Sequence, residues 1–367
     1  MALSPLFVPV AYDSLPGWAE DDHAAAFAAF RLSAVQARLK PYRTGSLGAD
    51  FASFSGACDE ARGSALASRS DARSFFERHF APFRVSPEPA AHGFVTGFYE
   101  PVVPASATQT AVFGVPLLAR PDDLVDVDDG NRPEGLDPYF AFGRQSDTAI
   151  VEYFDRAAIE QGALRARNLE IAWVEDPVDA FFIHVQGSAR LAMVDGSVRR
   201  VTYAAKTGHP FTGAGKVLAG LGEIPLADVT MQSIRRWFRQ NPARVNEILW
   251  RNRSYIFFRD ADVDDPALGP VAAAKVPLTP GRSVAVDRLL HTFGTPFFIQ
   301  APALRDFCGG GPLSRLMIAQ DTGSAIVGAA RGDLFTGSGF AAGEIAGVIK
   351  HAADFFALLP RALAGRT

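Results

Sequence analysis

The sequence lacks most of the features that mark a specialised class of protein. Only two of its 367 residues are cysteines, and no apolar run approaches the length needed to cross a bilayer. Acidic and basic residues nearly balance, 40 against 36, and no basic block stands out. A disulfide-rich scaffold, a membrane-spanning helix and a nucleic-acid partner are therefore not expected. The composition, 48% hydrophobic and 21% charged, is that of a globular protein with room for two domains.

The cysteines and histidines do not form a recognisable site. Cys58 and Cys308 are far apart in the sequence and pair only if distant segments meet, so two unpaired thiols are expected. His184 and His209 lack partners at metal-ligand spacing. The acidic cluster at 122–129 lacks the ordered ligands of a calcium loop and is expected to be solvated. No metal and no cofactor are expected.

The first residues carry no recognisable targeting signal. The opening MALSP has no charged side chain, and the apolar stretch LFVPVAY behind it is too short for a signal peptide. No lipid-attachment cysteine lies nearby. The sequence by itself therefore predicts neither a secretion signal nor a lipid anchor.

Helices are expected first, and then a strand. Residues 15–40 read as a helix, and Ser70 is a candidate cap for a later one. Residues 92–100, HGFVTGFYE, alternate like a strand and end at Pro101. The apolar side chains expected to face the core are Trp18, Phe27, Phe30 and Val35 on the first helix and Phe75, Phe76 and Phe80 on the later one.

The middle of the chain reads as strands followed by helices. EIAWV, FFIHVQGSARLAMV and RRVTY are predicted strands between residues 170 and 203, with a hairpin turn at Asp195-Gly196. Asp176-Pro177 is predicted to be another turn. Two helix starts are expected after these strands, at Thr230 and at Pro242.

Two carboxylates stand out in the segment 315–347, RLMIAQDTGSAIVGAARGDLFTGSGFAAGEIAG. Asp321 ends an apolar run that reads as a buried strand, and Asp333 precedes Leu334 and Phe335. A carboxylate is unfavourable in apolar surroundings unless something compensates it, so the pair indicates an arranged site. Aspartates before glycine-rich turns are also common turn formers, and a purely structural role for both stays open.

This segment and GRSVAVDRLLHTFGTPFFI, residues 281–299, resemble the three-aspartate domain of the membrane-bound lytic transglycosylase A family. The three acids of that domain fall on Asp287, Asp321 and Asp333. The spacing between the last two is one residue longer than in the family's enterobacterial members.

Further segments resemble the family in the same order along the chain. They are TGFYEP from Thr96, HVQGSARL, and YAAKTGHPFTGAGKVL. Phe98 departs from the family, which often has tyrosine there. The resemblance extends from about residue 15 to residue 360.

The resemblance implies a mainly β fold with helices, α+β in class. A double-psi β-barrel domain with N-terminal helices is expected from residues 1–103 and 259–367. A smaller β-rich domain, inserted at residues 104–258, is expected to line the substrate groove.

The resemblance also implies an activity, cleavage of the β-1,4 bond between N-acetylmuramic acid and N-acetylglucosamine in peptidoglycan. A single carboxyl acts as acid and then as base, and the 6-hydroxyl of the muramic sugar closes onto C1, giving a 1,6-anhydro product. Asp333 falls at the family's catalytic position. Asp321 is expected to stay ionised beside it and, together with burial, to raise the pKa of Asp333. Asp287 is expected to hold a turn.

A set of polar residues and glycines is expected to bind the sugar chain. The polar members could instead have structural roles, as edge-strand residues, as caps of backbone groups or, for the lysine, in a solvated loop. The glycines are included because glycine lets the backbone approach a ligand closely. The set is Thr96, Tyr99, Gln186, Ser188, Lys206, Gly323 and Gly337.

The expected protein is a periplasmic lyase, an exotransglycosylase that works as a monomer on peptidoglycan strands. Association with the outer membrane is compatible with the family, although no anchor is visible in this sequence. Two other functions are retained as alternatives: a glycoside hydrolase acting on a β-1,4 glucan, and a non-catalytic, expansin-like cell-wall binding protein. Product analysis distinguishes the hydrolase from the transglycosylase. An exposed Asp333 with an ordinary pKa would favour the non-catalytic binding protein.

Overall fold

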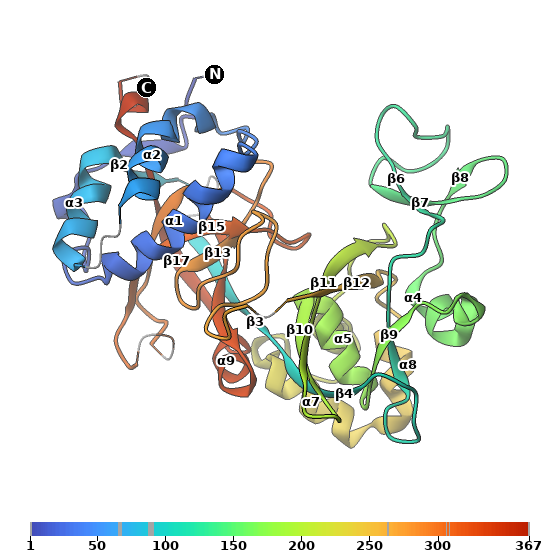
Figure 1. Cartoon of the computed structure of the whole chain (residues 1–367). Coiled ribbons are helices and arrows are strands. Elements are labelled where there is room, and N and C mark those ends of the chain that lie inside the picture. The colour runs from blue at the N-terminus through green and yellow to red at the C-terminus, as the bar shows by residue number, and fades with distance from the viewer. Residues whose placement is uncertain are drawn as a thin grey trace. The chain divides into compact units, whose positions relative to one another are not determined.

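A computed structural model describes residues 2–64, 68–86, 92–262, 264–305, 307 and 309–365. The chain divides into two compact units, one formed by Met1–Tyr99 with Asp265–Thr367 and the other by Glu100–Asp264 (Figure 1). The insert expected at 104–258 falls within the second unit. No helix of the described residues is long and apolar enough to cross a membrane.

The first unit combines three N-terminal helices with a sheet whose strands come from both ends of the chain. The sheet runs in the order β1-β2-β17-β14-β15-β13-β16-β3, and β17 also pairs with β3. That extra pairing closes the strands from β17 to β3 into a barrel. The elements are β1 (Phe7–Pro9), α1 (His23–Leu39), α2 (Ser55–Gly63), α3 (Arg69–His79), β2 (Phe80–Val85), β3 (Gly93–Glu100), β13 (Ser283–Val286), β14 (Pro296–Ala301), β15 (Leu313–Asp321), β16 (Arg331–Ser338), α9 (Phe340–Ala346) and β17 (Lys350–Pro360).

The core of the first unit lies between these helices and the barrel strands. α1 contacts α2, α3 and β15. Phe27 and Phe30 of α1 pack against Phe75 of α3, with ring centroids 4.9 and 5.8 Å apart. Buried residues of β13 to β17 belong to the same apolar cluster. The helices are therefore an integral part of the barrel's core.

The second unit has its own sheets and helices. A six-stranded sheet runs in the order β12-β11-β10-β4-β9-β5, and β6, β7 and β8 form a three-stranded sheet. The elements are β4 (Val102–Ser106), β5 (Val115–Leu118), β6 (Leu124–Asp126), β7 (Phe142–Gln145), β8 (Ile150–Val151), α4 (Arg156–Ala158), β9 (Glu170–Val174), α5 (Pro177–Gln186), β10 (Ser188–Met193), β11 (Val198–Lys206), α6 (Ala214–Gly220), α7 (Met231–Gln240), α8 (Val245–Leu249) and β12 (Ile256–Ala261).

The mixed α+β class is confirmed, and several predicted elements are present. The strand expected at 92–100 is β3, and the Asp195-Gly196 turn joins β10 to β11. Thr230 caps α7. Pro242 begins a short 3-10 helix directly before α8.

The predicted limits of the first helix were wrong. α1 begins only at His23, because Asp22 caps it by accepting a hydrogen bond from the Ala25 N–H at 3.2 Å. Trp18 is buried but precedes the helix. Val35 is 49% exposed, since it lies about 80° around the helix from Phe27.

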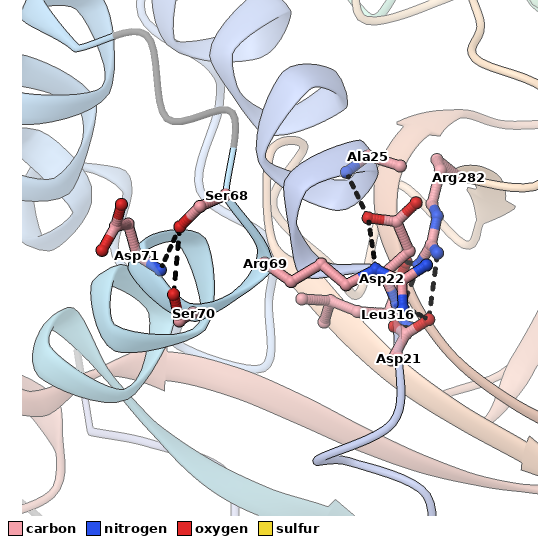
Figure 2. Close-up of polar contacts among 9 residues, drawn as sticks. All are labelled: Asp21, Asp22, Ala25, Ser68, Arg69, Ser70, Asp71, Arg282 and Leu316. Carbon is pink, nitrogen blue, oxygen red and sulfur yellow. Dashed lines mark hydrogen bonds and ion pairs between the residues drawn. The ribbon is translucent and has the colours of Figure 1, made fainter.

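The cap of the later helix was also misassigned. Ser68, and not Ser70, accepts the hydrogen bond from the Asp71 N–H, at 3.0 Å (Figure 2). Phe80 lies beyond this helix and begins β2. The aromatic side chains are buried as expected, although one of them belongs to a strand.

The strand predicted over FFIHVQGSARLAMV is a helix and a strand. α5 covers Pro177–Gln186, and β10 begins at Ser188. The Asp176 carboxylate caps α5 by accepting from the Val178 N–H at 2.8 Å, and Pro177 occupies the first helical turn. Gly187 ends the helix in the left-handed conformation. The Asp-Pro pair was thus a helix start, and its interpretation as a turn was wrong.

Of the two cysteines, Cys58 is buried in the first unit, where burial raises the pKa of its thiol to about 11. Cys308 lies outside the described residues.

A buried ion pair connects the segment before α1 to the barrel. Both guanidinium ends of Arg282 donate to the Asp21 carboxylate at 2.9 Å, and the Leu316 N–H of β15 donates to it at 2.7 Å (Figure 2). Arg282 also donates to the Leu316 carbonyl at 2.9 Å. Because both charged groups are buried, each depends on the other for compensation.

We expect Asp21→Asn to reduce the free energy of unfolding of the first unit by about 3 kcal/mol, because it leaves Arg282 buried without a carboxylate. Urea denaturation, followed by the fluorescence of the nearby Trp18, measures the loss.

Asp22→Asn is the matched control, because asparagine caps a helix as well as aspartate does and the expected loss is only a few tenths of a kcal/mol. Equal losses for the two variants would contradict the importance of the ion pair.

Candidate active site

The register of the barrel places Asp321 and Asp333 on either side of one residue. Ala285 of β13 pairs with Asp333 on antiparallel β16 and with Asp321 on parallel β15. The two carboxylates therefore lie on strands two spacings apart, which is roughly 9–10 Å between backbones. Two residues that are separated in the sequence are therefore neighbours on the barrel.

A bulge at Gln320 sets this register. Val284 pairs with Ala319 and Ala285 with Asp321, so Gln320 is an extra residue in β15. Its buried side chain accepts a hydrogen bond from the Ser283 hydroxyl at 2.5 Å. It also donates to atoms of α1, the Ala29 carbonyl and the Ser33 hydroxyl, at 2.8 and 2.9 Å. These bonds fix the bulge and with it the position of Asp321.

Asp333 is half-buried and has two polar neighbours. The Thr96 hydroxyl of β3 donates to Asp333 Oδ1 at 2.5 Å, and Arg331 Nη2 donates to the Thr96 oxygen at 2.7 Å. Burial raises the pKa of Asp333, while the Thr96 hydrogen bond and the charge of Arg331 oppose that rise. Burial prevails, so the carboxyl holds its proton more tightly than an exposed aspartate does.

Asp321 is half-buried at the end of β15. The Ala273 N–H donates to its Oδ1 at 3.2 Å. Burial raises the pKa of Asp321 to about 6. The N–H groups of Thr322 and Ala273 lower the pKa, and the charge of Asp333 raises it further. Asp321 and Asp333 are thus close enough to influence each other's ionisation.

The influence between the two carboxyls differs from the expected one in its direction. The sequence interpretation had Asp321 ionised and raising the pKa of Asp333. In the structure, the like-charge effect falls on Asp321. Arg331 acts on the other carboxyl, because its positive charge favours the ionised form of Asp333 and lowers the pKa of that group.

Asp287 directly follows β13 and holds two loops. Its carboxylate accepts from the Leu289 N–H at 3.1 Å and from the Gly328 N–H at 3.0 Å. The second bond reaches the segment between Asp321 and Asp333, which contains the extra residue of the spacing. Both carboxylate oxygens thus accept hydrogen bonds from backbone N–H groups, as expected for an aspartate that stabilises loops.

The other predicted site residues of the first unit are spread over several elements. The Tyr99 ring is buried against α9, where a Cβ at Gly343 would lie 2.8 Å from it. Gly337 of β16 has φ +123°, a conformation that requires glycine. Gly323 is exposed in the turn after β15. Thr96 contacts a carboxylate of the site, Asp333.

The predicted sugar-binding residues of the second unit lie on three elements, α5, β10 and β11. Gln186 ends α5 and Ser188 begins β10, on either side of Gly187, and Ser188 is buried. Lys206 lies at the end of β11, several residues beyond Thr202, which pairs with Ser188.

Arg331 was missed by the sequence interpretation, which treated VGAAR as a loop insertion. The residue begins β16, two positions before Asp333, so both side chains lie on the same face of the strand. The strand periodicity of RGDLF was a signal that could have identified it.

No three histidine, cysteine, aspartate or glutamate side chains of the described residues are grouped so as to hold a metal ion. The site as described is therefore built from two carboxyls, a hydroxyl, a guanidinium and backbone N–H groups.

Two family models match the sequence, the MltA specific insert domain over residues 94–259 and the 3D domain over residues 282–359. The membrane-bound lytic murein transglycosylase A of Escherichia coli K12 is 34% identical over 262 residues, which cover 70% of this chain and 62% of that protein. The match thus spans less than two thirds of this relative's own length.

Solved structures match over nearly the whole chain. The membrane-bound lytic murein transglycosylase from Agrobacterium tumefaciens is 50% identical with a TM-score of 0.93, covering 98% of this chain and 99% of that one. The structure of E. coli MltA with bound chitohexaose is 26% identical with a TM-score of 0.70, covering 98% and 96%. These matches confirm the resemblance expected from the sequence, and the chain belongs to the membrane-bound lytic murein transglycosylase A family.

Proposed function

We propose that this chain is a lytic transglycosylase that cleaves the β-1,4 bond between N-acetylmuramic acid and N-acetylglucosamine in peptidoglycan. The observation that carries the proposal is the half-buried Asp333, whose pKa is raised and whose Oδ1 accepts from Thr96. The family membership supports it. So does the relative from E. coli, whose structure holds chitohexaose, a polymer of the N-acetylglucosamine unit.

In the proposed reaction, Asp333 does two proton transfers. Its carboxyl gives a proton to the glycosidic oxygen as the bond from C1 to that oxygen breaks. The resulting carboxylate takes the proton of the 6-hydroxyl of the same muramic sugar, and that oxygen bonds to C1. The products are a 1,6-anhydro end and a free 4-hydroxyl, and no water is consumed. Because the nucleophile belongs to the substrate, its effective concentration is high.

A general acid must hold a proton near the working pH, and the surroundings of Asp333 supply part of that requirement. Burial raises its pKa in the free protein. A sugar ring over the site would remove more water from the carboxyl and raise the pKa further. Asp321, whose pKa is about 6, would change charge close to neutral pH and tune its neighbour.

A hydrolase is the second candidate, because a specific observation favours it. Hydrolytic glycosidases use two carboxyls, and here two carboxyls with raised pKa values lie on either side of Ala285. A non-catalytic wall-binding role has less support, since a sugar-binding surface does not need a buried, perturbed carboxyl.

The remaining proposals concern the setting and the contacts of the enzyme. The relatives are named membrane-bound, which supports action in the periplasm at the outer membrane, and a monomer is proposed. Tyr99, Gln186, Ser188, Lys206, Gly323 and Gly337 are proposed to contact the glycan. Thr96 is reassigned from the glycan to Asp333, because its hydroxyl donates to that carboxylate.

Purified peptidoglycan treated with the chain should release anhydromuropeptides, with no metal added and with a chelator present. Mass spectrometry of the products distinguishes the two candidates, because hydrolysis adds one water to each new muramic end. Products that carry only reducing ends would exclude transglycosylation and support the hydrolase.

Asp333→Asn should reduce turnover by more than the roughly hundredfold to ten-thousandfold that is typical for loss of a general acid or base, since both proton transfers depend on it. Asp321→Asn should cause a smaller loss. Initial rates of product release measure both effects, and binding of chitooligosaccharides should be retained.

Asp354→Asn provides the control, because Asp354 lies on β17 of the same barrel and pairs with Arg84 at 3.2 Å. Its rate should stay close to that of the unaltered chain. Near-normal turnover of Asp333→Asn, with an inactive Asp321→Asn, would assign the acid to Asp321.

Lys206→Ala should weaken the binding of chitooligosaccharides several-fold, because it removes a cationic donor from the proposed glycan surface. Calorimetric titration measures the affinity. Lys216→Ala, an exposed lysine of α6 in the same unit, is the control and should change nothing. If both variants bind as the unaltered chain does, Lys206 is not a glycan contact.

A further inference from the structure

Arg331 is a charged group of the site that the proposed reaction does not use directly. Nη2 donates to the Thr96 oxygen at 2.7 Å, and Nη1 donates to the Gly332 carbonyl. The guanidinium carbon lies 5.6 Å from the centre of the Phe94 ring, within cation–π range. These contacts hold one half-buried guanidinium at a fixed place beside Thr96.

The direction of the hydrogen bonds follows from the chemistry of the groups. A guanidinium can only donate, so the Thr96 oxygen must accept from Arg331. A hydroxyl has a single proton, and the 2.5 Å contact directs it to Asp333 Oδ1. If Oδ1 itself carried a proton, Arg331 and Asp333 would both donate to the Thr96 oxygen. The contact chain therefore favours an Oδ1 that accepts.

We propose that Arg331 is a positioning residue that directs the Thr96 proton onto Asp333 Oδ1 and leaves Asp333 Oδ2 as the oxygen that exchanges protons with the glycan. The kinetic consequence rests on the proposed function, whereas the orientation itself does not. Arg331 acts through Thr96 and need not touch the substrate. Its second effect is electrostatic, because a nearby positive charge stabilises the ionised carboxylate.

Other charged groups on neighbouring strands bear on the same carboxyl. Asp321 lies across Ala285 on β15, and the charge of Asp333 raises the pKa of Asp321. Lys350 of β17 pairs in register with Thr96. Arg331 is joined to Asp333 through the hydroxyl of Thr96.

The test is a titration of the Asp333 carboxyl by carbon-13 NMR in the full chain, with the resonance assigned by its loss in Asp333→Asn. In Arg331→Met the midpoint should rise by roughly one pH unit, because the opposing charge is gone while burial remains. Arg331→Lys, which keeps the charge and a donor, should restore most of the original midpoint.

Arg331→Gln keeps a donor for Thr96 without the charge, and it provides a second reading if Arg331→Met does not fold. Its midpoint should also rise. The matched control is Arg315→Met. Arg315 lies on another strand, β15, and its guanidinium carbon is 4.9 Å from the centre of the Phe307 ring, a cation–π contact of the kind that Arg331 makes. An Asp333 midpoint that is unchanged in both the Met and Gln variants, or that moves equally in Arg315→Met, would overturn the proposal.

The pH–rate profile gives a second readout. A higher pKa keeps the acid protonated to higher pH, so the alkaline limb of kcat/KM should move upward in Arg331→Met, with kcat more affected than KM. A limb that stays in place would contradict the proposed role. If the unaltered chain forms no anhydro products, the proposed function fails, and the titration still decides the role of Arg331.

Discussion

The position of β13 between β15 and β16 is the constraint on which the site depends. Ala285 pairs with Asp321 on one side and with Asp333 on the other. A small side chain there leaves the two carboxyls as the chemically active groups of this part of the barrel. Their ionisation is coupled because of this register, and neither pKa can be understood from its own strand alone.

The N-terminal helices stabilise that register. Gln320 is buried against α1 and fixes the bulge that brings Asp321 beside Ala285. Asp21, directly before α1, is bonded to Arg282 and to the Leu316 N–H of β15. The helical segment therefore does more than cover the apolar core, because it holds β15, which carries Asp321, and Arg282, which directly precedes β13. Loss of the Gln320 contacts or of the Asp21 contacts is expected to alter the site, although neither set includes Asp321 or Asp333.

The sequence was sufficient for the α+β class, for β3, for the buried strand that ends at Asp321 (β15), and for the two carboxyls as a candidate site. Local patterns failed where two signals competed, as at Asp176-Pro177, where a helix cap was taken for a turn. The polar surroundings of Asp333 could not be derived, because the Thr96 hydroxyl that donates to it belongs to β3, a strand far away in the sequence. The bulge at Gln320 was equally invisible, since it exists only relative to β13.

The most direct test of the account is a crystal structure of the Asp333→Asn chain with a bound N-acetylglucosamine oligomer. The account predicts a glycosidic oxygen within hydrogen-bond distance, about 2.6–3.2 Å, of the residue 333 side-chain atom that corresponds to Oδ2, with Thr96 still bonded to the other atom. A glycosidic oxygen that instead lies beside Asp321, or a sugar chain that does not reach β16, would contradict the assignment of Asp333 as the acid and base.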